Sequence, residues 1–283
     1  MADPLVQTDA LARRLGDPKL RIVDATWYLP TEKKDPDAEF LAAHIPGALR
    51  FDISTVCDKT HKAPHMLPSI EQFGRQVGEM GIGNEHEIIV YDKGEYAAAR
   101  VWWMFRVFGH DRVTVLDGGW VKWQAEGRPS VAGAAHASPA QFVPTFRPQL
   151  VRTMEEMRRN LDTKAEQVVD ARPPARFAGE LPEIRAGVAS GHIPGSRNIF
   201  YNETMTPEPR QYLPPAELAA KFRAKGYDLE SPIVATCGSG VSACQLALAL
   251  YLLGKKEVPV YDGSWAEWGA SDANPKVLGR DPD

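Results

Sequence analysis

The sequence predicts an α/β protein made of two tandem domains, each a parallel sheet flanked by helices on both faces. Three observations lead to this prediction. The 283 residues suit two domains of ordinary size. Short runs rich in Ile and Val alternate with stretches of helical apolar spacing. The second half of the chain also repeats the first, so the same fold is expected twice.

The repeat is read from a series of matches in one order. Ile88 to Asp92 returns as Ile233 to Cys237, an offset of 145 residues. At that offset, and without a gap, the matches include Gly109 with Gly254, Val113 with Val258, Val115 with Val260, Asp117-Gly118 with Asp262-Gly263, Trp120 with Trp265, and Trp123 with Trp268. Upstream, Ile22 to Ala25 matches Val168 to Ala171, and the tetrapeptide His-Ile-Pro-Gly occurs at 44–47 and 192–195. A duplicated domain accounts for this series.

The expected strands and helices follow one another in the same order in each copy. Strands are predicted at Leu20 to Asp24, Glu87 to Tyr91 and Val113 to Leu116, and again at Val168 to Asp170, Pro232 to Thr236 and Val258 to Tyr261. Helices are predicted at Val101 to Phe108 and Ala243 to Leu253, each stopped by a glycine, Gly109 or Gly254. Strand, helix, strand in this rhythm predicts right-handed βαβ units.

The two domains are expected to join where Ala, Pro, Gly and Ser crowd together, around 128–150. Prolines at 129, 139, 144 and 148 favour extended chain there. We therefore predict an N-terminal domain at 1–135, a linker at 136–150 and a C-terminal domain at 151–283.

Composition and charge exclude several classes of function. The formal charge of −4 argues against a surface for nucleic acid or another polyanion. The longest apolar run, Leu246 to Leu253, is too short to span a membrane, and Met1 to Leu15 lacks the core of a signal peptide. The three cysteines are few and odd in number, unlike those of a disulfide framework, so a cytoplasmic protein is expected. No zinc spacing, phosphate loop or dinucleotide motif is present, and no metal or cofactor is expected.

Ligands of open parallel sheets bind beyond the carboxyl ends of the strands, which directs attention to the turn after Thr236. This turn reads Cys237-Gly238-Ser239-Gly240-Val241-Ser242 and leads into a helix. Its glycines let successive amides point inward, and the helix N-terminus adds a positive dipole end. Both features favour a thiolate, the nucleophilic form of Cys237. The alternative is a buried cysteine that only packs.

Two other interpretations of this cysteine are disfavoured by the residues around it. Phosphatases with a cysteine loop place an arginine six residues later, and here that residue is Ala243. Cys244 could form a redox pair with Cys237, but it falls in an apolar helix about two turns away, so packing is the preferred interpretation.

The repeated His-Ile-Pro-Gly, the Cys-Gly-Ser-Gly-Val-Ser loop and the closing Asp262 to Trp268 resemble the two-domain rhodanese-type sulfurtransferases. Within them the chain is most similar to the 3-mercaptopyruvate sulfurtransferases. Loops of thiosulfate users typically read Cys-Arg-Lys-Gly-Val-Thr, whereas here Gly238 and Ser239 hold the cationic positions. The resemblance implies two rhodanese folds, of which only the second is active. Asp92 at the cysteine position of the first copy agrees with this.

The resemblance also implies the roles of particular residues. Cys237 matches the family nucleophile, and its sulfur is surrounded by the amides of the loop: Gly238, Ser239, Gly240, Val241 and Ser242. Arg176 and Arg185 match two arginines that hold the carboxylate and keto oxygens of the substrate, a task suited to planar guanidinium groups. His65, in a His-Met-Leu-Pro motif, matches a histidine near the loop serine, so Ser239 and His65 are expected to relay a proton; a purely structural role for this histidine is the alternative.

The chain departs from the family pattern at one position of this relay. An acidic residue often completes it, and here that position is Ser54; Asp52 lies close by but points to the other face if the stretch is extended. Ser242 replaces the usual Thr and keeps the hydroxyl. His44 and His192 occur in both copies, so they are expected to fix the turns before Pro46 and Pro194.

The function expected from these residues is a ping-pong sulfur transfer from 3-mercaptopyruvate, through a persulfide on Cys237, to a thiol, thioredoxin or cyanide. A thiosulfate:cyanide sulfurtransferase is one alternative, and a non-enzymatic persulfide carrier is another. The expected partners are a small sulfur donor and a thiol acceptor, with no nucleic acid and no membrane.

Overall fold

The computed structural model of the chain describes residues 3–93 and 96–280, and they divide into two compact units. The first unit contains the chain up to Cys57, Leu67–Arg147 and Thr206–Tyr212. The second contains Asp58–Met66, Pro148–Met205 and the chain from Leu213 onward. Each unit thus includes one short segment from the opposite half of the sequence. The predicted domain limits of 1–135, 136–150 and 151–283 remain a prediction.

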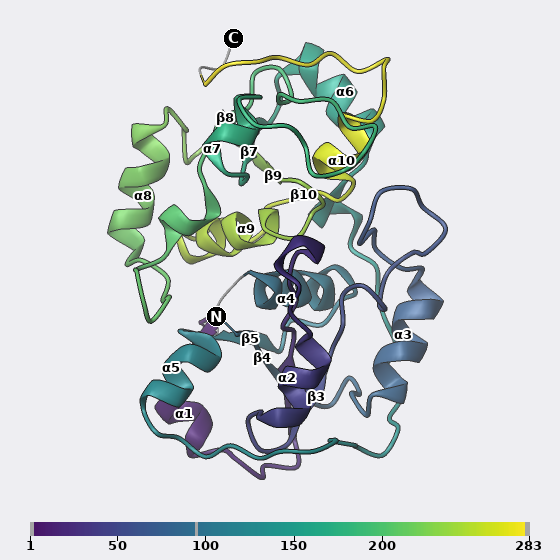
Figure 1. Ribbon diagram of the computed structural model, residues 1–283, viewed down its shortest axis with the longest axis vertical. Helices are drawn as coiled ribbons and strands as arrows, with labels where there is room; N and C mark the ends of the chain where they lie inside the picture. The colour runs from purple at the N-terminus through teal and green to yellow at the C-terminus, as the bar shows by residue number, and fades with distance from the viewer. Residues whose placement is uncertain (1–2, 94–95, 281–283) are drawn as a thin grey trace. The chain divides into compact units, whose positions relative to one another are not determined.

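Each unit holds a five-stranded sheet in which every pair of neighbouring strands is parallel. The strand order is β1-β5-β4-β2-β3 in the first unit and β6-β10-β9-β7-β8 in the second (Figure 1). These orders are the same once the strands are matched by their place in the repeat. The predicted α/β duplication is therefore confirmed.

The elements of the first unit come in the order β1 (Leu5–Val6), α1 (Thr8–Ala12), β2 (Leu20–Asp24), η1 (Pro30–Glu32), α2 (Pro36–Ala42), β3 (Ala48–Arg50), α3 (Ile70–Glu79), β4 (Glu87–Tyr91), α4 (Ala97–Val107), β5 (Val113–Leu116) and α5 (Gly119–Ala125). Helices α1, α2 and α5 share one apolar core with one face of the sheet. Helix α4 lies against β4 and β5, and Phe73 of α3 stacks on Phe108 just beyond α4. Helices therefore cover both faces, as predicted.

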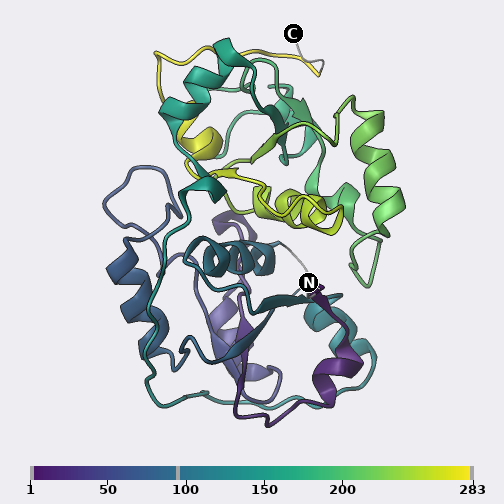
Figure 2. The same cartoon turned by 180° about the vertical axis from the view of Figure 1, so that it is seen from behind.

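The elements of the second unit are η2 (Pro148–Leu150), β6 (Val151–Arg152), α6 (Met154–Thr163), β7 (Gln167–Asp170), α7 (Pro174–Phe177), β8 (Arg197–Asn198), η3 (Tyr201–Thr204), α8 (Pro215–Ala224), β9 (Ile233–Thr236), α9 (Ala243–Leu252), β10 (Val260–Tyr261) and α10 (Ser264–Trp268). Helices α6 and α10 pack against the sheet through a core that includes Met157, Val234 and Trp265. Helix α9 lies alongside β9 and β10 in both views (Figures 1 and 2).

Local chemistry explains several of these boundaries. Strands β4 and β9 are buried on both faces, which is why they read as unbroken apolar runs. Ser69 caps α3, and a capping box of Thr153 and Glu156 opens α6. Gly109 and Gly254 follow α4 and α9 with φ of 87° and 93°, a left-handed conformation that suits glycine and ends the helix.

Two predicted elements differ from the structure. Helix α4 begins at Ala97 rather than Val101, because three alanines, which are strong helix formers, extend it toward the preceding loop. The strand predicted at 258–261 pairs only at Val260–Tyr261, since Pro259 has no amide hydrogen to give to a neighbour. The predicted linker is mostly irregular, and its stretch before Arg147 lies along the first unit, where the Ala140 amide donates to the carbonyl of Gly78.

No helix in the described part of the chain is both long enough and apolar enough to cross a membrane.

Candidate active site

The candidate site forms at the turn between β9 and α9, where the carboxyl end of a central strand meets the beginning of a helix. Cys237 directly follows β9 and is 1% exposed. The carbonyls of Cys237 and Gly238 accept hydrogen bonds from the amides of Trp265 and Ala266, both at 2.9 Å. This pairing turns the two carbonyls toward α10.

The amides of the same loop are left available. Gly238, Ser239, Val241 and Ser242 donate no backbone hydrogen bond to any acceptor in the described residues. Four unused amide donors therefore follow Cys237 directly, next to the start of α9, and backbone amides in such a loop are donors that can bind an anion. A thiolate or a persulfide on Cys237 is an anion of this kind.

The hydroxyl of Ser264 binds two amides of this loop, a role that the sequence analysis did not predict. Its Oγ lies 3.2 Å from the amide of Cys237 and 3.1 Å from the amide of Gly240, and it donates to the Tyr261 carbonyl at 2.7 Å. The backbone of Ser264 is left-handed, with a φ of 49°. The equivalent residue of the first copy is Gly119, with a φ of 51°. This serine-for-glycine difference at one aligned position is the signal that could have revealed its role.

The two predicted substrate arginines belong to the same unit as Cys237. A Cβ atom placed on Gly238 would lie 3.8 Å from Nη1 of Arg185, so this guanidinium lies beside the cysteine loop. Arg176 is on α7, half-buried, and its guanidinium makes no hydrogen bond or ion pair with the described residues. It therefore keeps its donors for a ligand. The structure gives no direct contact between Arg176 and the loop.

His65 lies in the segment Asp58–Met66, which belongs to the unit that contains Cys237. It is 8% exposed and has a φ of 60°. Ser239 is 6% exposed, and within the described residues no hydrogen bond joins its hydroxyl to the His65 ring. The relay of Ser239 and His65 thus remains a prediction.

His61 joins this segment to α10 of the second unit. His61 Nε2 lies 3.4 Å from Glu267 Oε1, and the hydroxyl of Tyr261 donates to the other carboxylate oxygen at 2.7 Å. Burial and the neighbouring Glu267 raise the pKa of Tyr261, so its hydroxyl stays protonated as a donor. Glu267 therefore links the segment to strand β10, three residues from Ser264.

The extended conformation on which the expectation for Asp52 depended does not occur. The stretch after Phe51 forms a turn, and the Asp52 carboxylate accepts from the amide of Ser54 at 2.8 Å and from the hydroxyl of Thr55 at 2.6 Å. These two bonds favour the turn over extended chain. The Ser54 hydroxyl accepts from the indole of Trp27 at 2.9 Å.

The remaining sequence predictions concern residues that pack. Cys244 is fully buried on α9, where its thiol donates to the carbonyl of Gly240, and none of the three described cysteines forms a disulfide. His44 and His192 are buried, stacked on Phe40 and Phe177, and bonded through Nδ1 to the carbonyls of those same residues. Both histidines thus hold the equivalent turn in each copy, as expected.

The chain matches the family model described as "Rhodanese-like domain" twice, over residues 7–126 and 153–271. It is 45% identical to the human 3-mercaptopyruvate sulfurtransferase, over 91% of this chain and 87% of that one. It is also 45% identical to the bovine thiosulfate sulfurtransferase, over 93% and 91% of the two chains. The crystal structure of SseA from Escherichia coli, described with 3-mercaptopyruvate sulfotransferases, superposes with a TM-score of 0.86 at 36% identity and covers 93% and 99%.

The chain belongs to the rhodanese family. Its first rhodanese domain has an aspartate where the second has its cysteine. The buried Asp92 carboxylate accepts from the amide of Ala98 at 2.8 Å, and its carbonyl accepts from Trp120 as that of Cys237 does from Trp265. The first domain thus occupies a helix-start amide with its own side chain. Gly94 and Glu95 of this loop lie outside the described residues.

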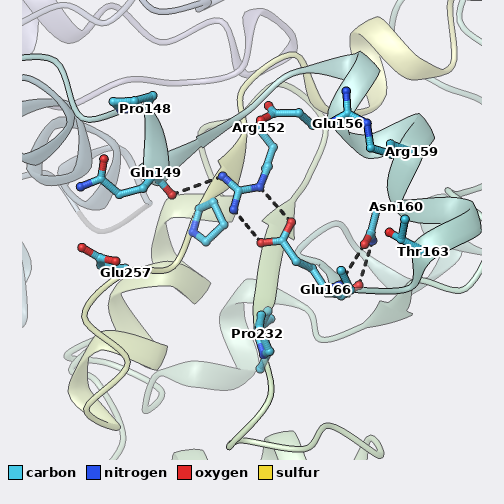
Figure 3. A pocket seen from close by; sticks show the side chains of 13 residues that line it. Pro148, Gln149, Arg152, Glu156, Arg159, Asn160, Thr163, Glu166, Pro232 and Glu257 are labelled. Carbon is cyan, nitrogen blue, oxygen red and sulfur yellow. Dashed lines mark hydrogen bonds and ion pairs between the residues drawn. The ribbon is translucent and has the colours of Figure 1, made fainter.

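A pocket elsewhere in the second rhodanese domain is not a candidate site. It has a volume of about 630 Å³ and lies at the amino ends of β9 and β10 (Figure 3). Cys237 instead follows the carboxyl end of β9. Two of its charged groups, Arg152 and Glu166, pair with each other at 2.8 and 2.9 Å, and Asn160 bonds the backbone of Glu166. No cluster of His, Cys, Asp or Glu suited to a metal occurs among the described residues.

Proposed function

We propose that this rhodanese is a 3-mercaptopyruvate sulfurtransferase, with Cys237 as the nucleophile. The observation that carries the proposal is the loop itself: unused amides surround a cysteine, and the Arg185 guanidinium lies beside Gly238. The donor is an anion with a carboxylate and a keto oxygen. Arg185 and Arg176 supply forked donors for these oxygens.

The reaction runs in two half-reactions. The Cys237 thiolate attacks the sulfur of 3-mercaptopyruvate, an S–S bond forms, and the C–S bond breaks to release the enolate of pyruvate. The proton of the donor thiol ends on the enolate carbon, and Ser239 and His65 are the groups we assign to that transfer. Cys237 remains as a persulfide anion, which the loop amides stabilise. A thiol or cyanide then takes the outer sulfur and restores the thiolate.

Replacing the nucleophile tests the proposal directly. We expect Cys237→Ser to abolish pyruvate release from 3-mercaptopyruvate, because a serine hydroxyl at this position forms no persulfide. Cys244→Ser is the matched control, since this buried cysteine lies on the adjoining helix and takes no part in the reaction. Substantial pyruvate release by the Cys237 variant would contradict the assignment, and mass spectrometry of the protein would show whether the wild type gains one sulfur atom.

Thiosulfate is the second candidate donor, favoured by the identity to thiosulfate sulfurtransferases. The loop argues against it as the preferred donor, because Gly238 and Ser239 bring no cation to an inorganic dianion. The ratio of kcat/KM for the two donors separates these activities. A persulfide carrier without donor turnover is the third candidate; in that case Arg185→Ala would leave sulfur loading unchanged.

For the acceptor we propose a small thiol or reduced thioredoxin, and for the compartment the cytoplasm. The support is chemical: three cysteines without a disulfide suit a reducing environment that also supplies thiols. Comparing turnover with dithiothreitol, with thioredoxin kept reduced by its reductase, and with cyanide would rank the acceptors.

A further inference from the structure

The copy of the fold without a nucleophile serves as an internal control for the copy that has one. Side chains needed only for folding should recur in both copies, whereas side chains tied to the reaction should occur in the second copy alone. At the end of the second strand, Asp24 and Asp170 correspond. Each accepts a hydrogen bond from the amide two residues on, at 2.8 and 2.9 Å, yet that residue is Thr26 in the first copy and Arg172 in the second.

Arg172 is the centre of a buried network in the second unit. Its guanidinium bonds both carboxylate oxygens of Asp170, the carbonyl of Gly191 at 2.8 Å and the Glu183 carboxylate at 2.9 Å. The side chains of Arg172 and Glu183 are each 3% exposed. Burial alone would lower the pKa of Arg172, but the carboxylates of Asp170 and Glu183 outweigh it and raise this pKa. The Arg172 guanidinium therefore stays charged at neutral pH.

The network reaches both sides of the candidate site. Glu183 is two residues before Arg185, whose guanidinium lies beside Gly238. The Arg172 guanidinium also lies 4.6 Å above the ring of Trp265, which follows the loop-fastening Ser264. Trp265 in turn donates its indole hydrogen to the carbonyl of Ala189, at the far end of the segment that carries Arg185. The buried Arg172 thus contacts both Glu183, two residues before Arg185, and Trp265, next to the serine that binds the cysteine loop.

We propose that Arg172 and Glu183 are positioning residues that hold Arg185 in the orientation in which it binds the donor's carboxylate. This inference rests on the proposed function, because it needs a donor that Arg185 binds. The side chains of Arg172 and Glu183 are both buried, so the Glu183 carboxylate can move little relative to the guanidinium that it binds. When Glu183 is removed, Arg172 still pairs with Asp170. The chain around Arg185 then loses the contact with Arg172 that Glu183 provides.

The test uses Glu183→Ala with a matched control on the same segment. We expect KM for 3-mercaptopyruvate to rise about tenfold while kcat stays within twofold of the wild type, because a misplaced guanidinium weakens donor binding. Transfer of sulfur from the preloaded persulfide to cyanide should be unchanged. The control is Glu180→Ala, three residues before Glu183, which removes an exposed ion pair with Arg280. It should leave KM and kcat unchanged.

A conservative variant and a binding measurement complete the experiment. Glu183→Gln keeps an acceptor oxygen for Arg172 and should recover at least half of the lost affinity. The dissociation constant of 3-mercaptopyruvate, measured by calorimetry in a Cys237→Ser background, should follow KM. The proposal would be overturned if KM in E183A stays within twofold of the wild type, including the case in which kcat and the melting temperature both fall while KM is unchanged. It would also be overturned if E183Q recovers none of the lost affinity. A wild type that releases no pyruvate would instead overturn the proposed function.

Discussion

Ser264 illustrates how a single residue distinguishes the two copies. Its left-handed backbone is unfavourable for any residue with a Cβ atom, and the first copy has Gly119 there. The second copy accepts this strain because the hydroxyl bonds two amides of the cysteine loop. Residues in sparsely populated backbone regions persist where surrounding contacts hold them, often at functional sites.

Replacing this serine by the residue of the first copy should separate activity from stability. Ser264→Gly removes about 1 kcal/mol for each hydrogen bond to the loop and relieves about 1 kcal/mol of backbone strain. We expect kcat/KM for 3-mercaptopyruvate to fall about tenfold while the unfolding free energy in urea stays within about 1 kcal/mol of the wild type. Unaltered kinetics in S264G would contradict the role given to the hydroxyl.

At this scale the sequence was informative only where neighbours in the chain are also neighbours in space. Cys237 could be predicted, because its glycines and the helix that follows are adjacent to it. Ser264 and Arg172 could not, since their contacts are with residues 27 and 11 positions away in sequence. The sequence left the conformation at Asp52 open, and the structure has a turn there in which the Ser54 amide donates to the Asp52 carboxylate.

Among the elements, the segment Asp58–Met66 carries His65 and contacts Glu267 through His61. His61 Nδ1 accepts the amide of Ala63 at 3.0 Å, which places the proton of the neutral ring on Nε2, toward Glu267. The sequence located His65 by its motif, but the fold places this segment in the unit opposite to its own half of the chain. No periodicity in the sequence reports such an exchange.

Removing the His61 contact should loosen this segment without unfolding the protein. In His61→Ala we expect trypsin to cleave after the exposed Lys59 and Lys62 several-fold faster than in the wild type, because local opening governs cleavage of a folded chain. His136→Ala, in the predicted linker, is the control. Mass spectrometry of the fragments measures the cleavage rates. Equal rates in the wild type and H61A would show that the His61–Glu267 contact does not hold the segment.

For the whole molecule, stability against acid depends on buried histidines. His110 is 5% exposed and packs against Phe105 and Phe142, and burial lowers its pKa, with Arg112 adding to the effect. The unfolded chain binds a proton at this residue below a pH of about 6.5, whereas the folded chain does not until lower pH. The unfolded state then binds more protons, so stability falls as the pH decreases through this range.

A variant without this titration should resist acid better. His110→Phe keeps an aromatic ring in the cluster, and its unfolding free energy should decline less between pH 6.5 and 5, by up to about 1.4 kcal/mol per pH unit. Urea titrations at several pH values measure this slope. Identical slopes for the wild type and H110F would contradict the assignment.

The duplicated architecture was predictable because the repeat keeps its spacing, and equal strand orders followed from equal sequences. Element ends were less so: Ala97 extends α4 and Pro259 shortens β10. The membership of the short segments was not predictable, because it depends on contacts between distant parts of the chain.

That exchange of segments bears on how such a protein can evolve. Residues 58–66 belong to the unit made mainly by the second half, and 206–212 to the unit made mainly by the first. A gene broken between the halves would encode two products, each lacking a piece of its own body and carrying a piece of the other. Recombination that shuffles one half into a new gene would separate His65 from Cys237. The two halves are therefore expected to be inherited together, although only one of them has the reactive sulfur.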